Sequence, residues 1–249
     1  MENVNNSYFN GYYKDIWKTI IPPELTVRES DFIQSYFKLQ PGNRVLDLMC
    51  GYGRHALALG RKGISVTAID NLSEYIEDVK ITAAGENLPV DAFQTDVVNY
   101  EAEGLFDLTL CMGNSLCFFK EHDVLSILKM ISRHLAPRGY FFLNTWMLAE
   151  IAFNNFRERS WINVGDLKYI TESKYLLQPS RIETEHLIIA PDGLTETKIA
   201  IDYIYSISET EKLLAEAGIV MEDVFSIPGK KKFTLGDPRA YIIGRLHSA

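Results

Sequence analysis

Short apolar runs alternate with amphipathic stretches along the first 145 residues. Five apolar runs, each bounded by polar or turn residues, predict strands at residues 44–49, 65–69, 91–94, 106–112 and 140–143. Apolar residues at helical spacing predict helices between them, over 54–61, 73–86 and 122–135. Strands that are apolar along most of their length and alternate with helices are typical of a parallel sheet with both faces covered. We therefore predict an α/β fold with a doubly wound, Rossmann-like sheet.

Two helices are expected before the first strand. Residues 7–20 carry an aromatic-rich helical pattern that stops at Pro22-Pro23, and residues 27–37 carry a second one. Further along the chain, Ser73 is the expected N-cap of the helix over 73–86.

After about residue 158 the pattern changes to alternating apolar and polar residues. It predicts an antiparallel meander with strands at 167–177, 181–190 and 195–205. Ser208 is expected to cap the next helix, and the last two strands, 220–227 and 240–246, are too close in sequence for a helical crossover, so they should pair antiparallel. The predicted organisation is N-terminal lid helices and a Rossmann-like core in 1–158, an inserted antiparallel β-meander cap in 159–206, and completion of the core in 207–249.

Composition and charge narrow the class of protein. Of 249 residues, 25 are Lys or Arg and 33 are Asp or Glu, which gives a net charge of −8. An acidic chain without a dense basic stretch argues against a nucleic-acid partner. The chain lacks a signal-peptide pattern and an apolar run of the roughly 18–20 residues that cross a bilayer. We expect a cytoplasmic monomer or homodimer with no membrane partner and, because no ligand cluster has usable spacing, no metal.

Polar and glycine residues follow the ends of the predicted parallel strands. Because these ends meet at one edge of the sheet, they predict a ligand crevice there. The residues concerned are Asp47, Gly51, Gly53, Asp70, Asp96, Asn114 and Ser115.

Two ligands fit this pattern, a dinucleotide and S-adenosylmethionine (SAM). Gly51 and Gly53 allow close approach of a ligand to the backbone, and Asp70 offers acceptors to a ribose diol. Asp47 suits the ammonium of SAM, and Asp96 suits an adenine amino group. Arg54 at the helix start favours a phosphate instead. The antiparallel final hairpin favours SAM.

The motifs resemble those of class I SAM-dependent methyltransferases over nearly the whole chain. Residues 45–53 are similar to the first motif of that superfamily, with Tyr52 where a small residue is commoner, and residues 66–70 and 95–97 are similar to its ribose and adenine motifs. The resemblance implies a SAM cofactor. It adds Cys50, Asn71, Tyr75, Val97, Met112, Asn114 and Ser115 to the expected cofactor contacts.

A narrower resemblance is to glycine N-methyltransferases. Tyr8-Phe9-Asn10-Gly11, Trp17 and Arg28 match their N-terminal segment, whose Tyr, Trp and Arg close over SAM, and residues 111–116 are similar to their substrate loop. The chain departs from the family at Trp146, the position of an Arg that grips the substrate carboxylate. No Arg occurs between Tyr140 and Phe156. Glycine is therefore doubtful, and a less anionic or more aromatic acceptor fits better.

The sequence thus predicts methyl transfer from SAM to a small-molecule acceptor, with an amine nitrogen as the leading choice. O-methylation of a small hydroxylated compound is the alternative within enzymes and would need a base. A regulatory protein that binds SAM without turnover is the alternative outside enzymes. Asn114 and His122 are the catalytic candidates, and the candidate substrate contacts are Tyr13, Phe118, Trp146, Tyr203 and Tyr205.

Overall fold

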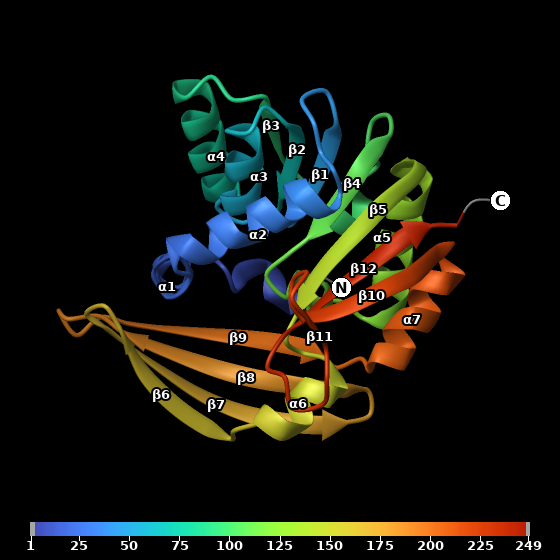
Figure 1. The fold of residues 1–249 in the computed structure, drawn as a ribbon. Coiled ribbons are helices and arrows are strands. Elements are labelled where there is room, and N and C mark those ends of the chain that lie inside the picture. Colours follow the sequence, from blue (N-terminus) through green and yellow to red (C-terminus); the bar gives the residue numbers. More distant parts are fainter. Residues whose placement is uncertain (1–2, 248–249) are drawn as a thin grey trace.

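The computed structural model describes residues 3–247 and arranges them in two sheets (Figure 1). Within these residues the larger sheet has eight strands in the order β11-β10-β12-β5-β4-β1-β2-β3. The strands from β5 to β3 in this order run parallel, whereas β12, β10 and β11 pair antiparallel. This confirms the predicted α/β fold and its antiparallel final hairpin. The bounds are β1 Arg44–Leu48, β2 Ser65–Asp70, β3 Val90–Gln94, β4 Phe106–Cys111, β5 Leu135–Thr145, β10 Ile219–Ile227, β11 Lys231–Lys232 and β12 Ala240–Leu246.

Helices cover both faces of the large sheet (Figure 1). Ile33, Leu59 and Val79, from α2, α3 and α4, belong to the buried cluster on one face, and Ile131 and Leu214, from α5 and α7, belong to the cluster on the other. The bounds are α1 Tyr12–Ile20, α2 Pro23–Tyr36, α3 Arg54–Gly60, α4 Ser73–Gly85, α5 Glu121–His134, α6 Ala149–Asn155 and α7 Ile207–Glu216, with 3₁₀ turns η1 Val4–Ser7, η2 Val97–Asn99 and η3 Ser115–Phe118. No helix within residues 3–247 is both long enough and apolar enough to cross a membrane.

The second sheet is antiparallel and lies along one side of the core (Figure 1). Its strands, in sequential order, are β6 Arg159–Val164, β7 Leu167–Leu177, β8 Ser180–Ile189 and β9 Thr195–Tyr203. Asn5 attaches it to the N-terminal segment, because its amide Nδ2 donates to the carbonyl of Ile201 at 3.0 Å and its Oδ1 accepts from the N–H of Ile201 at 2.9 Å. The same Nδ2 donates to the carbonyl of Phe118 in the core at 3.1 Å.

Two predicted helix caps are wrong. Leu72 rather than Ser73 holds the N-cap position of α4, because Asp70 accepts the Leu72 N–H and fixes the turn one residue earlier. Ser206 rather than Ser208 caps α7, where it forms a reciprocal capping box with Glu209.

Some helices and strands begin or end at other residues than the hydrophobic pattern predicted. Tyr8 and Phe9 precede α1, because Gly11 takes a left-handed φ of 63° and the helix starts after it. Strand β5 begins at Leu135 and includes Pro137-Arg138-Gly139, where its pairing with β4 is irregular. The predicted end of the preceding helix therefore lies inside this strand. The sequence did not predict α6, β6 or the two-residue β11.

Glu29 of α2 is a buried carboxylate shared by three neighbours. Its Oε2 accepts a hydrogen bond from Arg54 Nη1 at 2.5 Å and lies 3.0 Å from His55 Nε2, and its Oε1 accepts from the Tyr241 hydroxyl at 2.5 Å. Burial raises the pKa of Glu29, but His55, Arg54 and Tyr241 outweigh it and leave the pKa below its ordinary value. Burial lowers the pKa of His55, and the Arg54 charge lowers it further. The cluster connects α2, α3 and β12.

We expect the free energy of unfolding to fall as the pH drops below 6.5, the ordinary pKa of His. Folding lowers the pKa of both groups. As the pH falls, the unfolded chain therefore binds a proton at His55 from about 6.5, and at Glu29 from about 4.5, at a higher pH than the folded chain does. This difference favours unfolding at low pH. Glu29→Gln removes the charge that Arg54 faces and should cost roughly 3–5 kcal/mol at pH 7. Urea unfolding between pH 7 and pH 4 measures both effects.

Tyr241→Phe is the matched control, because it removes one hydrogen bond to Glu29 and keeps the ring. It should cost about 1.5–3 kcal/mol. A Glu29→Gln chain that unfolds within about 1 kcal/mol of the parent would contradict the role given to this carboxylate.

Candidate functional site

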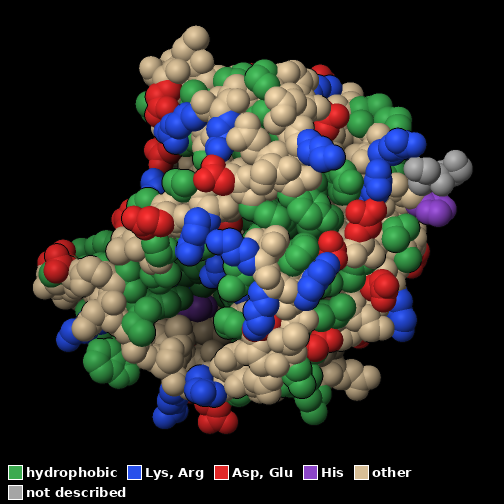
Figure 2. Space-filling view, viewed as in Figure 1, with side chains coloured by type: hydrophobic (Ala, Val, Ile, Leu, Met, Phe, Trp, Pro, Cys, Tyr) green, Lys and Arg blue, Asp and Glu red, His purple; other side chains and the backbone are tan. Residues whose placement is uncertain are grey.

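Two adjoining cavities lie at the edge where the parallel strands end. The smaller, named the crevice pocket, has a volume of about 90 Å³ and is lined by residues that include Asp47, Gly51 and Asp70. The larger, named the large cavity, has a volume of about 1420 Å³ and lies between the core and the second sheet. Figure 2 shows its hollow. Both cavities are lined by Phe9, Trp17, Gly113 and Phe118, so these residues form their common wall.

Asp47 brings an unpaired carboxylate oxygen to the crevice pocket. The residue lies within β1 and is 1% exposed, and its Oδ2 has no hydrogen-bond partner among residues 3–247. Burial raises the pKa of Asp47 to about 7, although the charge of Arg54 opposes the shift. A buried carboxylate without a partner is costly. This end of the pocket therefore favours a cationic ligand group.

Asp70, the last residue of β2, offers acceptors on the other side of the pocket. Its Oδ2 accepts from the N–H of Gly51 at 2.9 Å and its Oδ1 from the N–H of Leu72 at 3.0 Å. Burial raises the pKa of Asp70, and these N–H donors oppose the rise. Each carboxylate oxygen keeps a further lone pair, which is the chemistry that suits a ribose diol.

The two glycines of the strand-to-helix turn have different roles. Gly51 has φ of 55° and open space where a Cβ would stand, and it lines the crevice pocket. Gly53 has φ of 74° and does not line the pocket, because its absent Cβ would lie 2.4 Å from Val79 of α4. Gly53 therefore serves helix packing. Met49, at φ of 53°, is a strained residue on the pocket wall that the sequence did not single out.

Arg54, which would suit a phosphate, is held by other groups. Its Nη1 donates to Glu29 and, at 3.3 Å, to the Thr26 hydroxyl. The chief observation in favour of a dinucleotide is therefore weakened.

The expected cofactor contacts divide between the two cavities. Those that line the crevice pocket are Trp17, Asp47, Cys50, Gly51, Asp70, Asn71, Tyr75, Asp96, Val97, Met112 and Ser115. Tyr8, Arg28 and Asn114 line the large cavity instead. Tyr8 is buried there, with its hydroxyl 3.4 Å from that of Tyr169.

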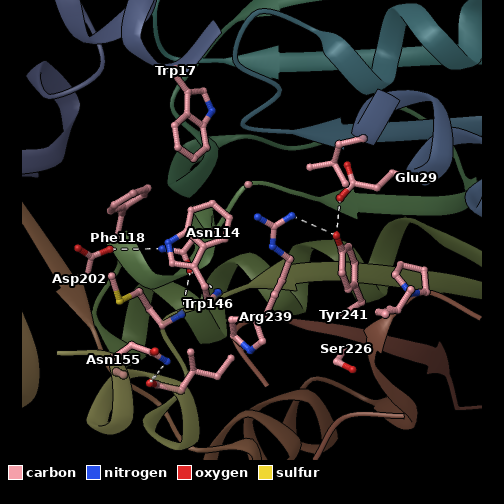
Figure 3. Close-up of a pocket in the computed structure, with 18 of the residues that line it drawn as sticks. Trp17, Glu29, Asn114, Phe118, Trp146, Asn155, Asp202, Ser226, Arg239 and Tyr241 are labelled. Atoms are coloured by element: carbon pink, nitrogen blue, oxygen red, sulfur yellow. Dashed lines mark hydrogen bonds between the residues drawn. The ribbon is translucent and has the colours of Figure 1, made fainter. Parts of the chain in front are cut away.

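Asn114 joins the core to the second sheet (Figure 3). Its Oδ1 accepts from the Thr145 hydroxyl at 2.8 Å and from the N–H groups of Trp146 at 3.0 Å and Met147 at 3.2 Å. Its Nδ2 donates to Cys117 Sγ at 2.9 Å and lies 3.4 Å from Asp202 Oδ1. With its amide committed in this way, Asn114 acts as a positioning residue for the groups around it.

Asp202 of β9 and His186 of β8 form the buried end of the large cavity. Asp202 is 7% exposed, and burial raises its pKa to about 6, so the carboxylate is mainly ionised at pH 7. Its polar contacts within residues 3–247 fall on Oδ1, which also accepts from Cys117 Sγ at 3.0 Å. His186 Nδ1 lies 2.5 Å from the Tyr169 hydroxyl, and burial lowers the pKa of His186 to about 4, so the ring is neutral at pH 7. Figure 2 shows histidine inside the hollow.

The open end of the large cavity carries Arg239, the residue before β12. Its guanidinium carbon lies 5.4 Å from the centre of the Trp146 ring, and its Nη1 lies 3.4 Å from the Tyr241 hydroxyl. The Trp146 ring is 5.6 Å from that of Trp17 in the common wall. Figure 3 shows Arg239 between Trp146 and Tyr241.

Of the candidate substrate contacts, Tyr13, Phe118 and Trp146 line the large cavity, whereas Tyr203 and Tyr205 do not. The structure therefore does not place these two tyrosines in the cavity. Side chains alternate along a strand, and Asp202 takes the inward face, so Tyr203 points away from the cavity. Tyr205 follows the strand and donates its hydroxyl to the carbonyl of Phe119 at 2.9 Å.

His122, the other catalytic candidate, lies outside both cavities. It lies in the first turn of α5, where its side chain is 74% exposed and its Nε2 is 3.1 Å from Asp123 Oδ1.

Sequence reasoning missed Asp202, His186, Arg239 and Tyr241. Asp202 and His186 face the site because of the register of the second sheet, which the alternating pattern does not fix. Arg239 carried a usable signal. An antiparallel β12 begins at the edge where β5 ends, and Ala240 pairs with Thr145, so residue 239 has to lie beside residue 146.

Part of the chain matches known methyltransferases in sequence. Residues 45–139 match the family model of a methyltransferase domain. The ubiquinone biosynthesis O-methyltransferase of Xanthomonas campestris is 35% identical over 117 residues, which are 45% of this chain and 47% of that protein. The enzyme of the same name from Rickettsia typhi is 31% identical over 104 residues, or 41% and 40% of the two chains. The chain therefore spans less than half the length of these curated relatives.

Solved structures are similar over almost the whole chain. A SAM-dependent methyltransferase from Clostridium acetobutylicum has a TM-score of 0.80 at 18% identity, covering 95% of this chain and 96% of that one. The CcbJ methyltransferase of Streptomyces caelestis has a TM-score of 0.84 at 14% identity, with 100% of both chains covered. A SAM-bound amino pentose methyltransferase from Micromonospora echinaspora has a TM-score of 0.70 at 16% identity, covering 95% and 97%. The chain thus shares its fold with these methyltransferase structures, and its residues 45–139 match the methyltransferase domain model.

Proposed function

We propose that this protein is a SAM-dependent methyltransferase that methylates a small-molecule acceptor at an amine nitrogen. The observation that carries the proposal is the junction of the two cavities. A narrow pocket with an unpaired carboxylate opens, past Phe9, Trp17, Gly113 and Phe118, into a large cavity with a second carboxylate at its buried end.

The residues of the crevice pocket fit SAM. Asp47 would hold the ammonium, Asp70 the ribose hydroxyls and Asp96 the adenine amino group. Bound SAM supplies a methyl group activated by its sulfonium. At about 90 Å³ the pocket is smaller than the roughly 300 Å³ at which ligand pockets begin. The side chains over it, Phe9 and Trp17 among them, have to move aside to admit a nucleoside.

The second sheet and the N-terminal segment would enclose the acceptor, with residues 159–206 acting as a cap. Enclosure excludes water and aligns the acceptor with the methyl group, which are the main contributions a protein makes to this reaction. A cavity roofed in this way suits a small molecule better than a protein or RNA chain.

Asp202 supports nitrogen as the acceptor atom. Its ionised carboxylate would attract an ammonium to the buried end of the cavity, where the rings of Tyr13, Trp17 and Phe118 offer faces to a cation. The ammonium would first have to give up a proton, to Asp202 or to solvent, so that the nitrogen lone pair could take the methyl group that bound SAM would supply. The neutral His186 ring nearby could accept a proton only weakly, since its pKa is lowered to about 4.

A hydroxylated acceptor is the second candidate, because the curated relatives above are named O-methyltransferases. Oxygen would need a base at the acceptor, and Asp202, with its pKa raised to about 6, is better matched to that task than His186.

Asp70→Ala tests the cofactor. We expect micromolar binding of SAM to the parent chain by isothermal titration, weakened at least about tenfold in the variant because the ribose acceptors are lost. Asp91→Ala, on the exposed surface of β3, is the control and should bind SAM as the parent does. Binding of NADH in place of SAM would refute the methyltransferase proposal.

SAM binding should strengthen as the pH rises from 6 to 8. Burial raises the pKa of Asp47 to about 7, and only the ionised carboxylate attracts the ammonium, so binding releases a proton. Below pH 7 the affinity should fall by up to about tenfold per pH unit. Asp47→Asn should bind weakly with little pH dependence. A parent chain whose SAM affinity is flat over this range would exclude Asp47 as the ammonium partner.

Asp202→Asn tests the acceptor atom. A panel of small amines and phenols is screened for methyl transfer, and kcat/KM for an amine substrate should fall roughly 10- to 100-fold in the variant, with SAM affinity unchanged. Lys168→Gln, on the same sheet but outside the lining, is the control. Activity confined to phenols would reverse the choice of acceptor atom.

A further inference from the structure

The open end of the large cavity is lined by four cations, Arg28, Arg157, Lys230 and Arg239. None of them forms a salt bridge within residues 3–247. This is unusual in a chain of net charge −8. Figure 2 shows the Lys and Arg side chains gathered at the rim of the hollow.

The acids that line the cavity do not neutralise this end. Glu29 is committed to Arg54, and Asp31 pairs with Lys62 at 2.6 Å. Asp202 lies at the buried end, next to Cys117 and Asn114. The large cavity is therefore electronegative at its buried end and electropositive at its open end, and such a field selects the orientation of a charged ligand.

Arg239 is the best positioned of the four cations. Its half-buried guanidinium lies against the Trp146 ring and near the Tyr241 hydroxyl, and that hydroxyl is itself committed to Glu29. Asn114 holds the backbone of Trp146 in turn. A guanidinium carries five N–H donors in a planar fork. Among residues 3–247 only the contact with Tyr241 uses one of them, so the others remain available to a ligand.

We propose that the methyl acceptor carries an anionic group, a carboxylate or a phosphate, which Arg239 binds at the open end of the large cavity. The planar fork of N–H donors on a guanidinium can bind two oxygens of a carboxylate or phosphate at once, and contact with the Trp146 ring holds the Arg239 guanidinium in place for this. The position of the reacting atom beside Asp202 rests on the proposed function above, whereas the anion site rests on the cations alone.

The dimensions of the site describe the rest of the acceptor. Trp17 and Trp146 form a continuous aromatic wall between the methyl-transfer end and Arg239. The cavity, at about 1420 Å³, exceeds the roughly 300–1,000 Å³ of ordinary ligand pockets. The acceptor is therefore larger than a free amino acid and presents a flat or apolar body between its two ends.

This proposal differs from the expectation of a less anionic acceptor. That expectation rested on the absence of an Arg between Tyr140 and Phe156. The cation comes instead from the neighbouring antiparallel strand, and Trp146 supports it.

The experiment compares three probes that share one aromatic body, 3-phenylpropionate, phenyl phosphate and 3-phenylpropanamide. Each probe is titrated into the protein both without and with added S-adenosylhomocysteine, and binding is measured by calorimetry and by tryptophan fluorescence. The carboxylate or the phosphate should bind at least about tenfold more tightly than the neutral amide, as expected for a charge-assisted contact. Which of the two binds more tightly identifies the anion.

Arg239→Gln should abolish the preference for the anion, and Arg239→Lys should retain part of it. Arg138→Gln, an exposed arginine on β5 that does not line the cavity, is the matched control and should keep the full preference. Equal binding of amide and anions by the parent chain, or a preference that survives in Arg239→Gln, overturns the proposal.

Titrating SAM separately into the same variants keeps the two proposals distinct. Unchanged SAM affinity in Arg239→Gln, together with loss of the anion preference, supports both. An anion preference that depends on Arg239 in a chain that binds no SAM supports the anion site and refutes the proposed function.

Discussion

The geometry of the large cavity depends on the side-chain amide of Asn114. The residue stands after β4 with a left-handed φ of 71°, a conformation that Asn tolerates better than most residues. From there its oxygen fixes the chain that leaves β5, including the backbone of Trp146, and its nitrogen reaches Cys117 and Asp202 of the second sheet. Asn114 therefore positions residues at both ends of the large cavity from one place at the edge of the parallel sheet.

This arrangement explains how a separate antiparallel sheet can serve a site built on the parallel one. The second sheet has its own backbone pairing and contacts the rest of the molecule through side chains. The buried side chains of Asn5 and Asn114 provide hydrogen bonds to it, one set from the N-terminal segment to β9 and one from the core to Asp202. Buried amides of this kind are costly when unsatisfied, so they fix a single arrangement of the two sheets.

The sequence was sufficient for the parallel core, because its strands are almost wholly apolar and its helices have strong periodicity. It also led to Asp47, Gly51 and Asp70, since the ends of parallel strands must meet. It failed where the outcome depends on pairing between distant segments. The inward face of β9 belongs to Asp202 because of its register with β8, and a shift of one residue would have presented Tyr203 instead. Gly53 shows a different limit, since a glycine required by Val79 packing cannot be told from one required by a ligand.

The shared carboxylate of Glu29 has a consequence for how the two cavities communicate. It touches Arg54, which lines the crevice pocket, and through Tyr241 it touches Arg239, which lines the large cavity. A ligand that draws on the charge of either arginine alters how that carboxylate is shared with the other. If filling one cavity changes the affinity of the other, that coupling is reciprocal and has the same factor in both directions. Cooperativity between cofactor and acceptor would then be a property of four side chains, without any movement of the sheets.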